Sequence, residues 1–311
     1  MSAYLAVEIT SEEASRTVEQ LLRRRLALSG ARIRSLKFAP EGILVNGKKA
    51  RTTTILHAGD RVEVLRDDPA ARTEKLQPCE TDGGLQFLIV YEDDCLLVVN
   101  KPAGLVMHPA GGHRADTLAN RLRAYLDETA PAARVHFVGR LDKDTSGLVV
   151  CAKNAAAAEK LRKEKARGAF GKEYLALVSG VLPASSEESA VCLPLSPVRD
   201  PESRIVRMEP DPEGLPAQTF YTALQNFSGY SLLRLRLGSG RTHQIRAHMA
   251  AIGHPLLGDP LYGDPAVNER FSPLLSRHAL QAASLSFVHP ESGLPLSFTA
   301  PMPEDMAALL H

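Results

Sequence analysis

The hydrophobic pattern of the first 67 residues predicts a small unit of helices and short strands. Residues 15–27 carry apolar side chains at helical spacing, with arginines on the other faces, and a second basic stretch covers residues 31–38. The run ILVNGKKAR indicates a hairpin that turns at Asn46-Gly47, and alternation over residues 61–65 predicts one more strand. We therefore expect an N-terminal α/β module over residues 1–67.

Residues 68–84 are polar, contain Pro and Gly and have no apolar period, which is typical of a linker. From residue 85 to 311, strand-like runs dominate. These runs are FLIVYE, CLLVVN, GLVVCAK, EYLALVSG, AQTFYTAL and YSLLRLRL, and helical patterns lie at residues 115–127, 154–167 and 242–252. Tight turns at Asp93-Asp94 and Ser228-Gly229 favour antiparallel hairpins. The pattern predicts an α+β domain with a mixed, largely antiparallel sheet flanked by helices, and an excursion from the sheet over residues 181–216.

Composition narrows the class of protein. Hydrophobic residues make up 44% and charged residues 23% of the 311 residues, as in ordinary globular proteins. The chain has no apolar run long enough to span a membrane, and its acidic start lacks the order of a signal peptide, so we expect a cytoplasmic protein without membrane contact. Its four cysteines are scattered, which favours reduced, buried thiols over zinc or disulfide sites.

The distribution of charge is more informative than the net charge of +1. Residues 1–67 contain 12 basic and 8 acidic residues, whereas the remainder contains 25 basic and 28 acidic residues. A basic excess in a small terminal module is expected where that module binds nucleic-acid phosphates.

Two segments carry the densest polar chemistry. In GRLDKDTSGLVVCAKN, residues 139–154, a glycine-bracketed polar loop leads directly into a strand, so its side chains are held on a rigid scaffold. The alternative is a turn whose Asp, Ser and Thr side chains only bond the backbone. In GSGRTHQIRAH, residues 238–248, Arg241 lies at a strand-to-helix junction and Thr242 is placed to cap the helix. The alternative there is a solvated basic helix face.

Other common signatures are missing from the sequence. His243, His248 and His254 lack the spacing and the glutamate of HExxH, and no GxSxG, GxGxxG or zinc-deaminase pattern occurs. Tyr174 opens a strand, where a tyrosine is most often half-buried packing. We therefore expect neither a metal ion nor a cofactor.

In order, the motifs VNKPAGLVMHPA, RLDKDTSG, KEYLALVSG and GRTHQIRAH resemble those of the RluA-type family of RNA pseudouridine synthases, over residues 86–300. Residues 14–65 resemble the alpha-L RNA-binding module, related to a ribosomal small-subunit protein, that many members carry. The resemblance implies a pseudouridine synthase fold with a central RNA-binding cleft, an isomerase activity and a role in RNA modification. Large-subunit ribosomal RNA is the expected substrate, with transfer RNA second, and the protein is expected to be a monomer.

The resemblance also assigns roles to individual residues. Asp142 matches the catalytic aspartate, Tyr174 the tyrosine that packs on the uracil, and Arg241 the basic residue that pairs with the aspartate. Arg140 matches the arginine that holds the target nucleotide out of its stack, and Leu141 and Ile245 match an aliphatic wall. In the N-terminal module the expected RNA contacts are Arg23, Arg24, Arg32, Arg34, Lys37, Lys48 and Lys49. The chain departs from the family at Gly139 and Gln281, where histidines are common.

Two other functions compete with this interpretation. A non-catalytic RNA-binding protein could keep the fold, although it would not need Asp142, Tyr174 and Arg241 together. A glycosidase acting on free nucleosides would normally use two carboxylates. Asp142 and Asp144 are too close in sequence to be assumed such a pair, and the basic module would then have no role.

Overall fold

The computed structural model describes residues 4–26, 28, 33, 36–37, 41–65, 79, 88–110, 112–183, 187–200 and 205–310. The chain forms two compact units, residues 1–68 and residues 69–311, and each is described by itself. The expected linker, residues 68–84, lies outside the described residues apart from Cys79. Over the described ranges, no helix has the length and apolar character needed to cross a membrane.

The N-terminal unit is an antiparallel sheet packed against a helix. Its elements are β1 Tyr4–Glu8, α1 Val18–Arg24, β2 Ile43–Val45, β3 Lys48–Lys49 and β4 Arg61–Leu65, and the strand order is β1-β4-β2-β3. Helix α1 begins with a capping box between Thr17 and Gln20 and buries Val18, Leu21 and Leu22. The predicted hairpin is confirmed, with positive φ angles of 51° at Asn46 and 74° at Gly47. Strand β1 was not predicted, because its side chains are exposed or half-buried and carry little periodic signal.

The C-terminal unit is built on a ten-stranded sheet in the described residues. Its elements are β5 Ile89–Glu92, β6 Leu96–Lys101, α4 Leu118–Thr129, β7 His136–Phe137, β8 Ser146–Ala152, α5 Ala155–Ala166, β9 Gly171–Ser179, β10 Ser189–Val191, β11 Leu195–Arg199, β12 Val206–Pro210, β13 Thr219–Phe227, β14 Tyr230–Leu237, α6 Gln244–Ala251, α7 Pro265–Phe271, β15 Leu280–Val288, β16 Pro295–Thr299 and α8 Glu304–Ala307. The main strand order is β10-β13-β14-β9-β15-β8-β6-β5, with β16 paired to β15 and β7 to β8. All pairs are antiparallel except β15 with β8, so the predicted mixed, largely antiparallel α+β fold is confirmed.

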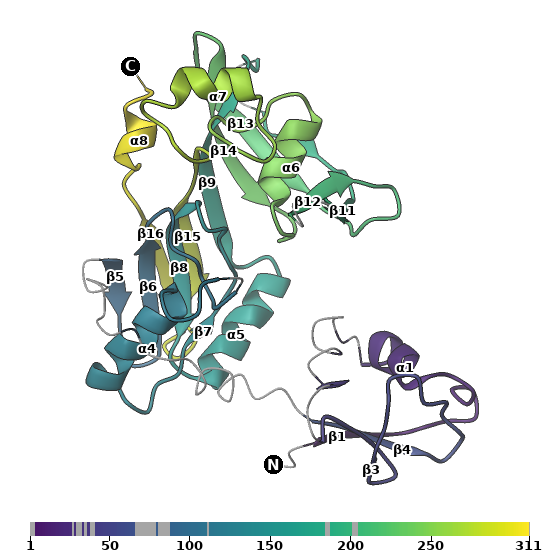
Figure 1. The fold of residues 1–311 in the computed structure, drawn as a ribbon. Helices are drawn as coiled ribbons and strands as arrows, with labels where there is room; N and C mark the ends of the chain where they lie inside the picture. The colour runs from purple at the N-terminus through teal and green to yellow at the C-terminus, as the bar shows by residue number, and fades with distance from the viewer. Residues whose placement is uncertain are drawn as a thin grey trace. The chain divides into compact units, whose positions relative to one another are not determined.

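Both faces of the sheet are covered around β6 and β8 (Figure 1). Leu97 and Val149 face α4, whereas Leu96 and Val150 face α5 on the other side. Successive residues of a strand point to opposite faces, so a strand covered on both sides reads as a continuous apolar run. This is why CLLVVN and GLVVCAK lack a polar alternation.

The excursion predicted for residues 181–216 is only partly correct. Strands β11 and β12 do form a separate two-stranded hairpin, but β10 pairs with β13 at the edge of the main sheet. The short helices α7 and α8 had no prediction. Each is only one or two turns long, so neither presents the repeated apolar spacing from which a helix is recognised.

Gly147 allows the parallel contact between β8 and β15. Its φ is +107°, and a Cβ there would lie 2.2 Å from the carbonyl oxygen of Ala282 on β15. Gly229, with φ +88°, has no atom within 4 Å of the same position. A side chain at either glycine would strain the backbone, but only at Gly147 would it also clash with a neighbouring strand.

We expect Gly147→Ala to lower the free energy of unfolding by roughly 1–3 kcal/mol more than Gly229→Ala does, because only Gly147 adds overpacking to the strain of a positive φ. Urea unfolding of both variants measures the difference. Equal losses would mean that β15 can move away from Gly147 at no cost.

Candidate active site

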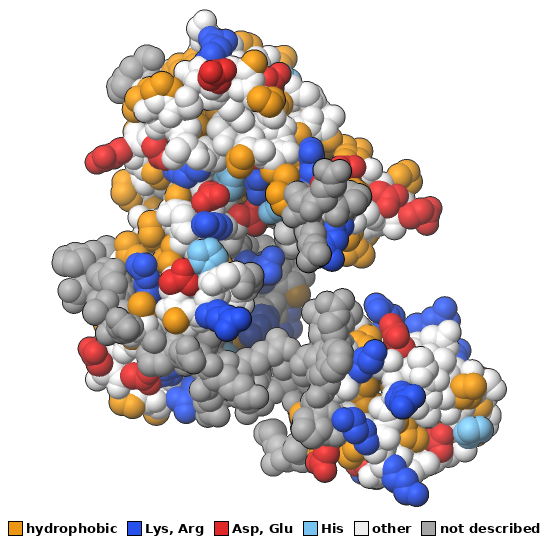
Figure 2. Space-filling model, viewed as in Figure 1, with side chains coloured by type: hydrophobic (Ala, Val, Ile, Leu, Met, Phe, Trp, Pro, Cys, Tyr) orange, Lys and Arg blue, Asp and Glu red, His pale blue; other side chains and the backbone are white. Residues whose placement is uncertain are grey.

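A cavity of about 780 Å³ lies in the C-terminal unit. It is lined by the loop before β8, the end of α5, the start of β9 and the segment from the end of β14 into α6. Figure 2 shows Lys, Arg, His and acidic side chains gathered across the middle of this unit. A cavity of this size is in the range of pockets that hold a small molecule or a single nucleotide.

Asp142 projects into this cavity and pairs with Arg246 of α6. The Asp142 Oδ2 atom lies 3.6 Å from Arg246 Nη1. Arg246 also makes a two-pronged bond to Asp259, with Nε to Oδ2 at 2.7 Å and Nη2 to Oδ1 at 2.8 Å. Burial alone would lower the pKa of Arg246, but the hydrogen bonds and charge of Asp259 outweigh it and raise that pKa. The arginine is therefore a permanent cation beside Asp142.

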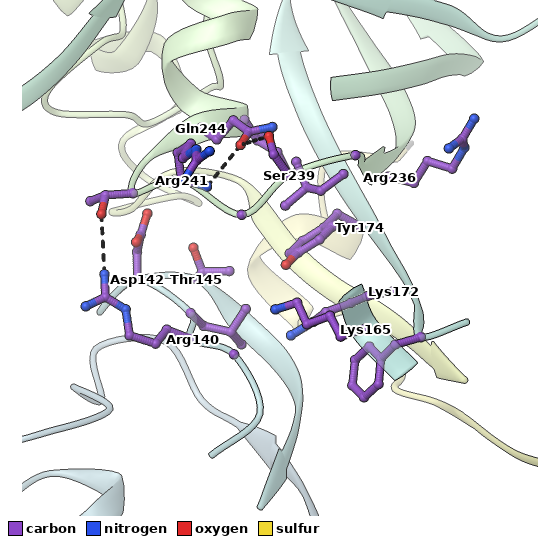
Figure 3. A pocket seen from close by; sticks show the side chains of 18 of the residues that line it. Arg140, Asp142, Thr145, Lys165, Lys172, Tyr174, Arg236, Ser239, Arg241 and Gln244 are labelled. Carbon is purple, nitrogen blue, oxygen red and sulfur yellow. Dashed lines mark hydrogen bonds between the residues drawn. The ribbon is translucent and has the colours of Figure 1, made fainter. Parts of the chain in front are cut away.

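The predicted pairing of Asp142 with Arg241 is wrong in its partner. Arg241 lines the same cavity, but its side chain is exposed and its Nε donates to the Pro216 carbonyl at 3.2 Å. Arg246, five residues later in the same GRTHQIRAH motif, lies beside the carboxylate instead. Figure 3 shows Arg241 and Asp142 in the cavity. The sequence offered the signal, since both arginines belong to one motif, but not the choice between them.

The expected Thr242 cap is also wrong. The residue that precedes α6 is His243, which has a left-handed φ of 51° and makes no capping bond with its side chain. Instead, Gln244 Oε1 accepts from the Arg241 backbone N–H at 3.0 Å and from the Ser239 hydroxyl at 2.8 Å. A left-handed histidine in a cavity is a strained conformation of the kind found at functional sites.

That strain brings His243 to the carboxylate. Its Nε2 lies 4.0 Å from Asp142 Oδ2, and its Nδ1 lies 3.2 Å from the hydroxyl oxygen of Tyr262. Burial lowers the pKa of His243, so the ring is neutral near pH 7. Tyr262 also accepts a hydrogen bond from the Met208 N–H of β12 at 2.7 Å, which ties the β11–β12 hairpin to the site. Sequence analysis gave no role to Tyr262.

The loop that carries Asp142 is held through its backbone. Lys101, which has no exposed surface, donates to the carbonyl oxygens of Pro102, Leu105 and Lys143 at 2.8, 2.9 and 2.8 Å. Arg277 donates to the Asp144 carbonyl at 3.1 Å and forms a two-pronged bond with Asp305 of α8. Buried donors that satisfy several carbonyls fix a loop firmly, because any movement would leave desolvated polar groups without partners.

Tyr174 lies on β9 and is 6% exposed, with its ring in the cavity wall (Figure 3). Burial, and then the charge of Asp142, raise the pKa of Tyr174, so the phenol stays protonated. Leu141 and Ile245 are buried and line the same cavity. Arg140 is exposed, and its Nη2 donates to the Thr242 hydroxyl at 3.4 Å. The structure therefore gathers every predicted residue of this unit around one cavity.

The predicted RNA-binding residues of the N-terminal unit are only partly described. Arg32 and Arg34 lie outside the described residues. Arg24, Lys37, Lys48 and Lys49 are exposed, and Arg23 is exposed but donates to Glu19 at 3.0 and 2.9 Å. Figure 2 shows several basic side chains on the visible face of this unit.

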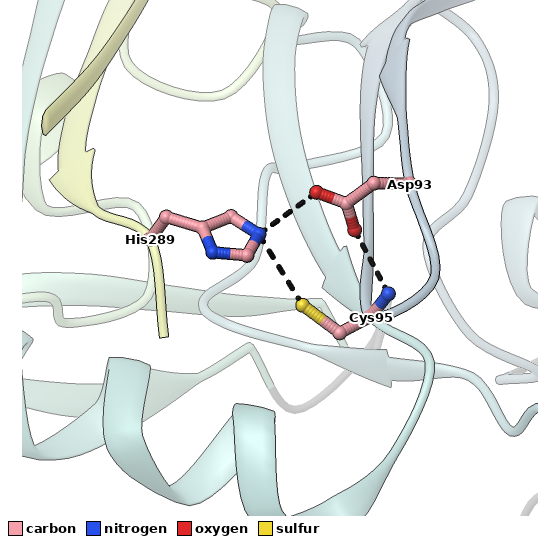
Figure 4. Close-up of side chains that lie close together, drawn as sticks. All are labelled: Asp93, Cys95 and His289. Carbon is pink, nitrogen blue, oxygen red and sulfur yellow. Dashed lines mark hydrogen bonds and ion pairs between the residues drawn. The ribbon is translucent and has the colours of Figure 1, made fainter. Parts of the chain in front are cut away.

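A second cluster, Asp93, Cys95 and His289, brings three possible metal ligands within 4.8 Å of one another (Figure 4). Its hydrogen bonds disfavour that use. His289 Nδ1 accepts from the backbone N–H groups of Glu291 and Ser292, at 3.3 and 3.0 Å, so the ring proton is on Nε2. That proton is donated to Asp93 at 2.8 Å, and Nε2 has no lone pair for a metal. The cluster joins the β5–β6 turn to the end of β15.

Comparison with known proteins agrees with this geometry. The family model described as RNA pseudouridylate synthase matches residues 95–251. The Bacillus subtilis protein named RNA pseudouridine synthase YlyB is 37% identical and covers 86% of this chain and 84% of its own length. The ribosomal large subunit pseudouridine synthase D of Nitrosomonas europaea is 40% identical, covering 81% of this chain and 71% of its own. That of Neisseria meningitidis serogroup B is 37% identical, covering 86% and 75%.

Solved structures agree on the fold. The human RNA pseudouridylate synthase domain containing 4 matches with a TM-score of 0.59 at 22% identity, covering 74% of this chain and 94% of that one. The human domain containing 1 matches with a TM-score of 0.54 at 28% identity, covering 68% and 82%. The chain belongs to the RluA-type family of RNA pseudouridine synthases. It is an isomerase that acts on uridine in RNA.

Breaking the Arg246 ion pairs should destabilise the fold. In Arg246→Met, Asp259, whose side chain has no exposed surface, loses its two-pronged partner, and we expect a loss of about 3–5 kcal/mol in the free energy of unfolding. Arg246→Lys keeps the charge but not the planar, two-pronged guanidinium, so its free energy of unfolding should lie between those of the wild type and Arg246→Met. Arg241→Met, at an exposed position, should cost about 1 kcal/mol or less. Urea unfolding compares the three variants.

The pH dependence gives a second readout. Burial would raise the pKa of Asp259, but Arg246 outweighs it and lowers that pKa below the unfolded value. Its stabilising contribution is therefore present above the unfolded pKa and lost as pH falls through the folded one. In Arg246→Met the sign should reverse, so that the variant gains stability toward acid pH as Asp259 becomes protonated. If the free energy of unfolding changes in the same way with acid pH in the wild type and the variant, Arg246 does not stabilise the charged form of Asp259.

Proposed function

We propose that the protein isomerises uridines of large-subunit ribosomal RNA, with Asp142 as the catalytic carboxylate. The observation that supports this most is the position of Asp142, half-exposed in the cavity between the fixed cation Arg246 and the stacking surface of Tyr174. The choice of ribosomal RNA rests on the relatives named ribosomal large subunit pseudouridine synthase D. Transfer RNA is the second candidate substrate.

Each neighbouring residue has a role in this proposal. Pseudouridine formation breaks the bond from ribose to N1 of uracil, turns the base and rejoins it through C5, without a net redox change. Tyr174 stacks on the flipped uracil, and Leu141 and Ile245 pack around it. Arg140 and Arg241 are exposed at the cavity and bind phosphate or fill the space that the base leaves. Arg246 pairs with Asp142 and orients its carboxylate.

No external group or electron is transferred, so the proposal needs no cofactor or metal ion. We also propose that the protein works as a monomer, and that it works in the cytoplasm because ribosomal RNA is the expected substrate.

Asp142→Asn tests the catalytic carboxylate, because it keeps the shape and removes the charge. We expect turnover to fall by at least about 10²–10⁴-fold with folding and RNA binding retained. Asp144→Asn is the matched control, since the Asp144 backbone carbonyl, not its carboxylate, makes the bond to Arg277. Tritium release from C5 of uridine in RNA measures turnover. Similar activity in both variants would identify the wrong aspartate, and release from free uridine would indicate a nucleoside enzyme.

We further propose that residues 1–67 form an alpha-L-type module that binds RNA through Arg23, Arg24, Arg32, Arg34, Lys37, Lys48 and Lys49. Its basic excess supports this role, as does the exposure of Lys48 and Lys49 on the edge strand β3. A contact to phosphate releases counterions, so it strengthens the dependence of affinity on salt.

Lys48→Gln combined with Lys49→Gln should weaken RNA binding and reduce the slope of log K against log salt by roughly one for each lost phosphate contact. The rate at saturating RNA should stay at the wild-type value. Lys143→Gln, at an exposed position in the C-terminal unit, is the control for a general loss of charge. An unchanged salt slope in the double variant would mean that Lys48 and Lys49 of the module do not contact RNA phosphates.

A further inference from the structure

The isomerisation leaves one proton transfer without a group to perform it. When C5 of uracil bonds to C1′ of the ribose, C5 still carries its hydrogen and the ring has a double bond between C6 and N1. That C5 proton must be removed, and N1 must gain one. Asp142 is engaged with Arg246 at 3.6 Å and lies 4.0 Å from His243, so a second group beside the base is the candidate for this step.

Tyr174 is unsuited to accept this proton. Its pKa is raised by burial and by the charge of Asp142, so the phenolate form is scarce near neutral pH. His243 is neutral, but it lies beside Asp142 and its Nδ1 is engaged with Tyr262. Both ring nitrogens of His243 are therefore close to other side chains, Asp142 and Tyr262.

Lys172 lies beside Tyr174 in the cavity wall. It precedes Tyr174 by two residues on β9, so both side chains leave the same face of the strand. Its Nζ lies 5.6 Å from the centroid of the Tyr174 ring, and the side chain lines the cavity (Figure 3). Within the described part of the chain, the Lys172 amino group has neither a hydrogen-bond acceptor nor a carboxylate at ion-pair distance. An amine whose one recorded contact is with the Tyr174 ring is available to a ligand that stacks there.

The charges around Lys172 favour its neutral form. Burial, and then the positive charges of Lys165 on α5 and Lys101 on β6, lower the pKa of Lys172 to about 7. Arg162 of α5 and Arg236 of β14 also line this end of the cavity, and Asp142 is the acidic group that faces it. Lys165 has room here because of Gly139, where a Cβ would lie 3.0 Å from the Lys165 Nζ. Figure 3 shows both lysines reaching into the cavity on the side of Tyr174.

We propose that Lys172, as a neutral amine, removes the C5 proton of uracil after the bond from C5 to C1′ has formed. The electron pair of the C5–H bond forms the C5–C6 double bond, and the pair of the C6–N1 double bond moves to N1. N1 then takes a proton from the Lys172 ammonium, which returns the lysine to its neutral form. Protons and charges balance without any other reactant. The inference rests on the proposed roles of Asp142 and Tyr174.

A deuterium isotope effect tests this step in the full-length protein. Transcripts of large-subunit ribosomal RNA and of transfer RNA are made with uridine or with uridine deuterated at C5, and pseudouridine formation is followed in single turnovers at saturating RNA. Lys172→Met should slow the reaction by about 10²–10⁴-fold and give a larger isotope effect than the wild type, because C5 deprotonation becomes limiting. Lys172→Arg should not restore the rate, since a guanidinium does not act as a base near neutral pH.

Lys165→Met is the matched variant for the charge environment. Removing a like charge raises the pKa of Lys172, so the neutral amine appears at higher pH and the acid side of the pH–rate profile should move upward. Lys165→Arg keeps the charge and should leave that limb in place. A limb that is unmoved in Lys165→Met overturns the proposal.

Two other results would also overturn it. If Lys172→Arg restores the rate, or if Lys172→Met slows it without a rise in the isotope effect, Lys172 only binds a phosphate or a uracil carbonyl. If His243→Gln alone raises the isotope effect, the histidine is the base. The wild-type reaction on the same transcripts tests the proposed function separately, because an incorrect role for Lys172 leaves wild-type product formation intact.

Discussion

The architecture of the active site depends on one buried carboxylate. Asp259 has no exposed side-chain surface, and an isolated charge there would be prohibitively costly. Arg246 offsets that cost with two short hydrogen bonds, and in doing so it loses the freedom to turn away from the cavity. Its remaining nitrogen lies 3.6 Å from Asp142. The Arg246–Asp259 pair thus fixes the cation beside Asp142.

The same principle holds the loop around Asp142. Lys101 and Arg277 are buried and donate to the carbonyls of Lys143 and Asp144, two neighbouring residues of the loop that follow Asp142. Asp305 extends this network to α8, so α8 helps to fix the loop that carries Asp142. By contrast, Lys165 and Lys172 line the cavity and their amino groups have no hydrogen-bond acceptor among the described residues.

Local patterns in the sequence were sufficient for most of the C-terminal sheet. Runs such as YSLLRLRL and the glycine turn at Ser228-Gly229 gave β14 and its hairpin, because each signal is contained within a few residues. The pairing of β10 with β13 at the sheet edge was missed. Whether a short strand joins the sheet depends on an unpaired edge of β13, which lies elsewhere in the sequence. The parallel contact between β8 and β15 could not be predicted from local patterns either, since it joins residues more than 130 positions apart.

The sequence by itself determined the family, the fold class and the residues that gather at the cavity, because ordered motifs carry Asp142, Tyr174 and the arginines of GRTHQIRAH. Only the tertiary structure decided which arginine faces Asp142. The left-handed conformation of His243 delays the start of α6 to Gln244, and this sets the helical phase that turns Arg246 inward and leaves Arg241 exposed. That choice depends on the backbone angle at His243 and on Asp259, which holds two nitrogens of Arg246 from 13 residues away, and neither can be read from a local sequence pattern.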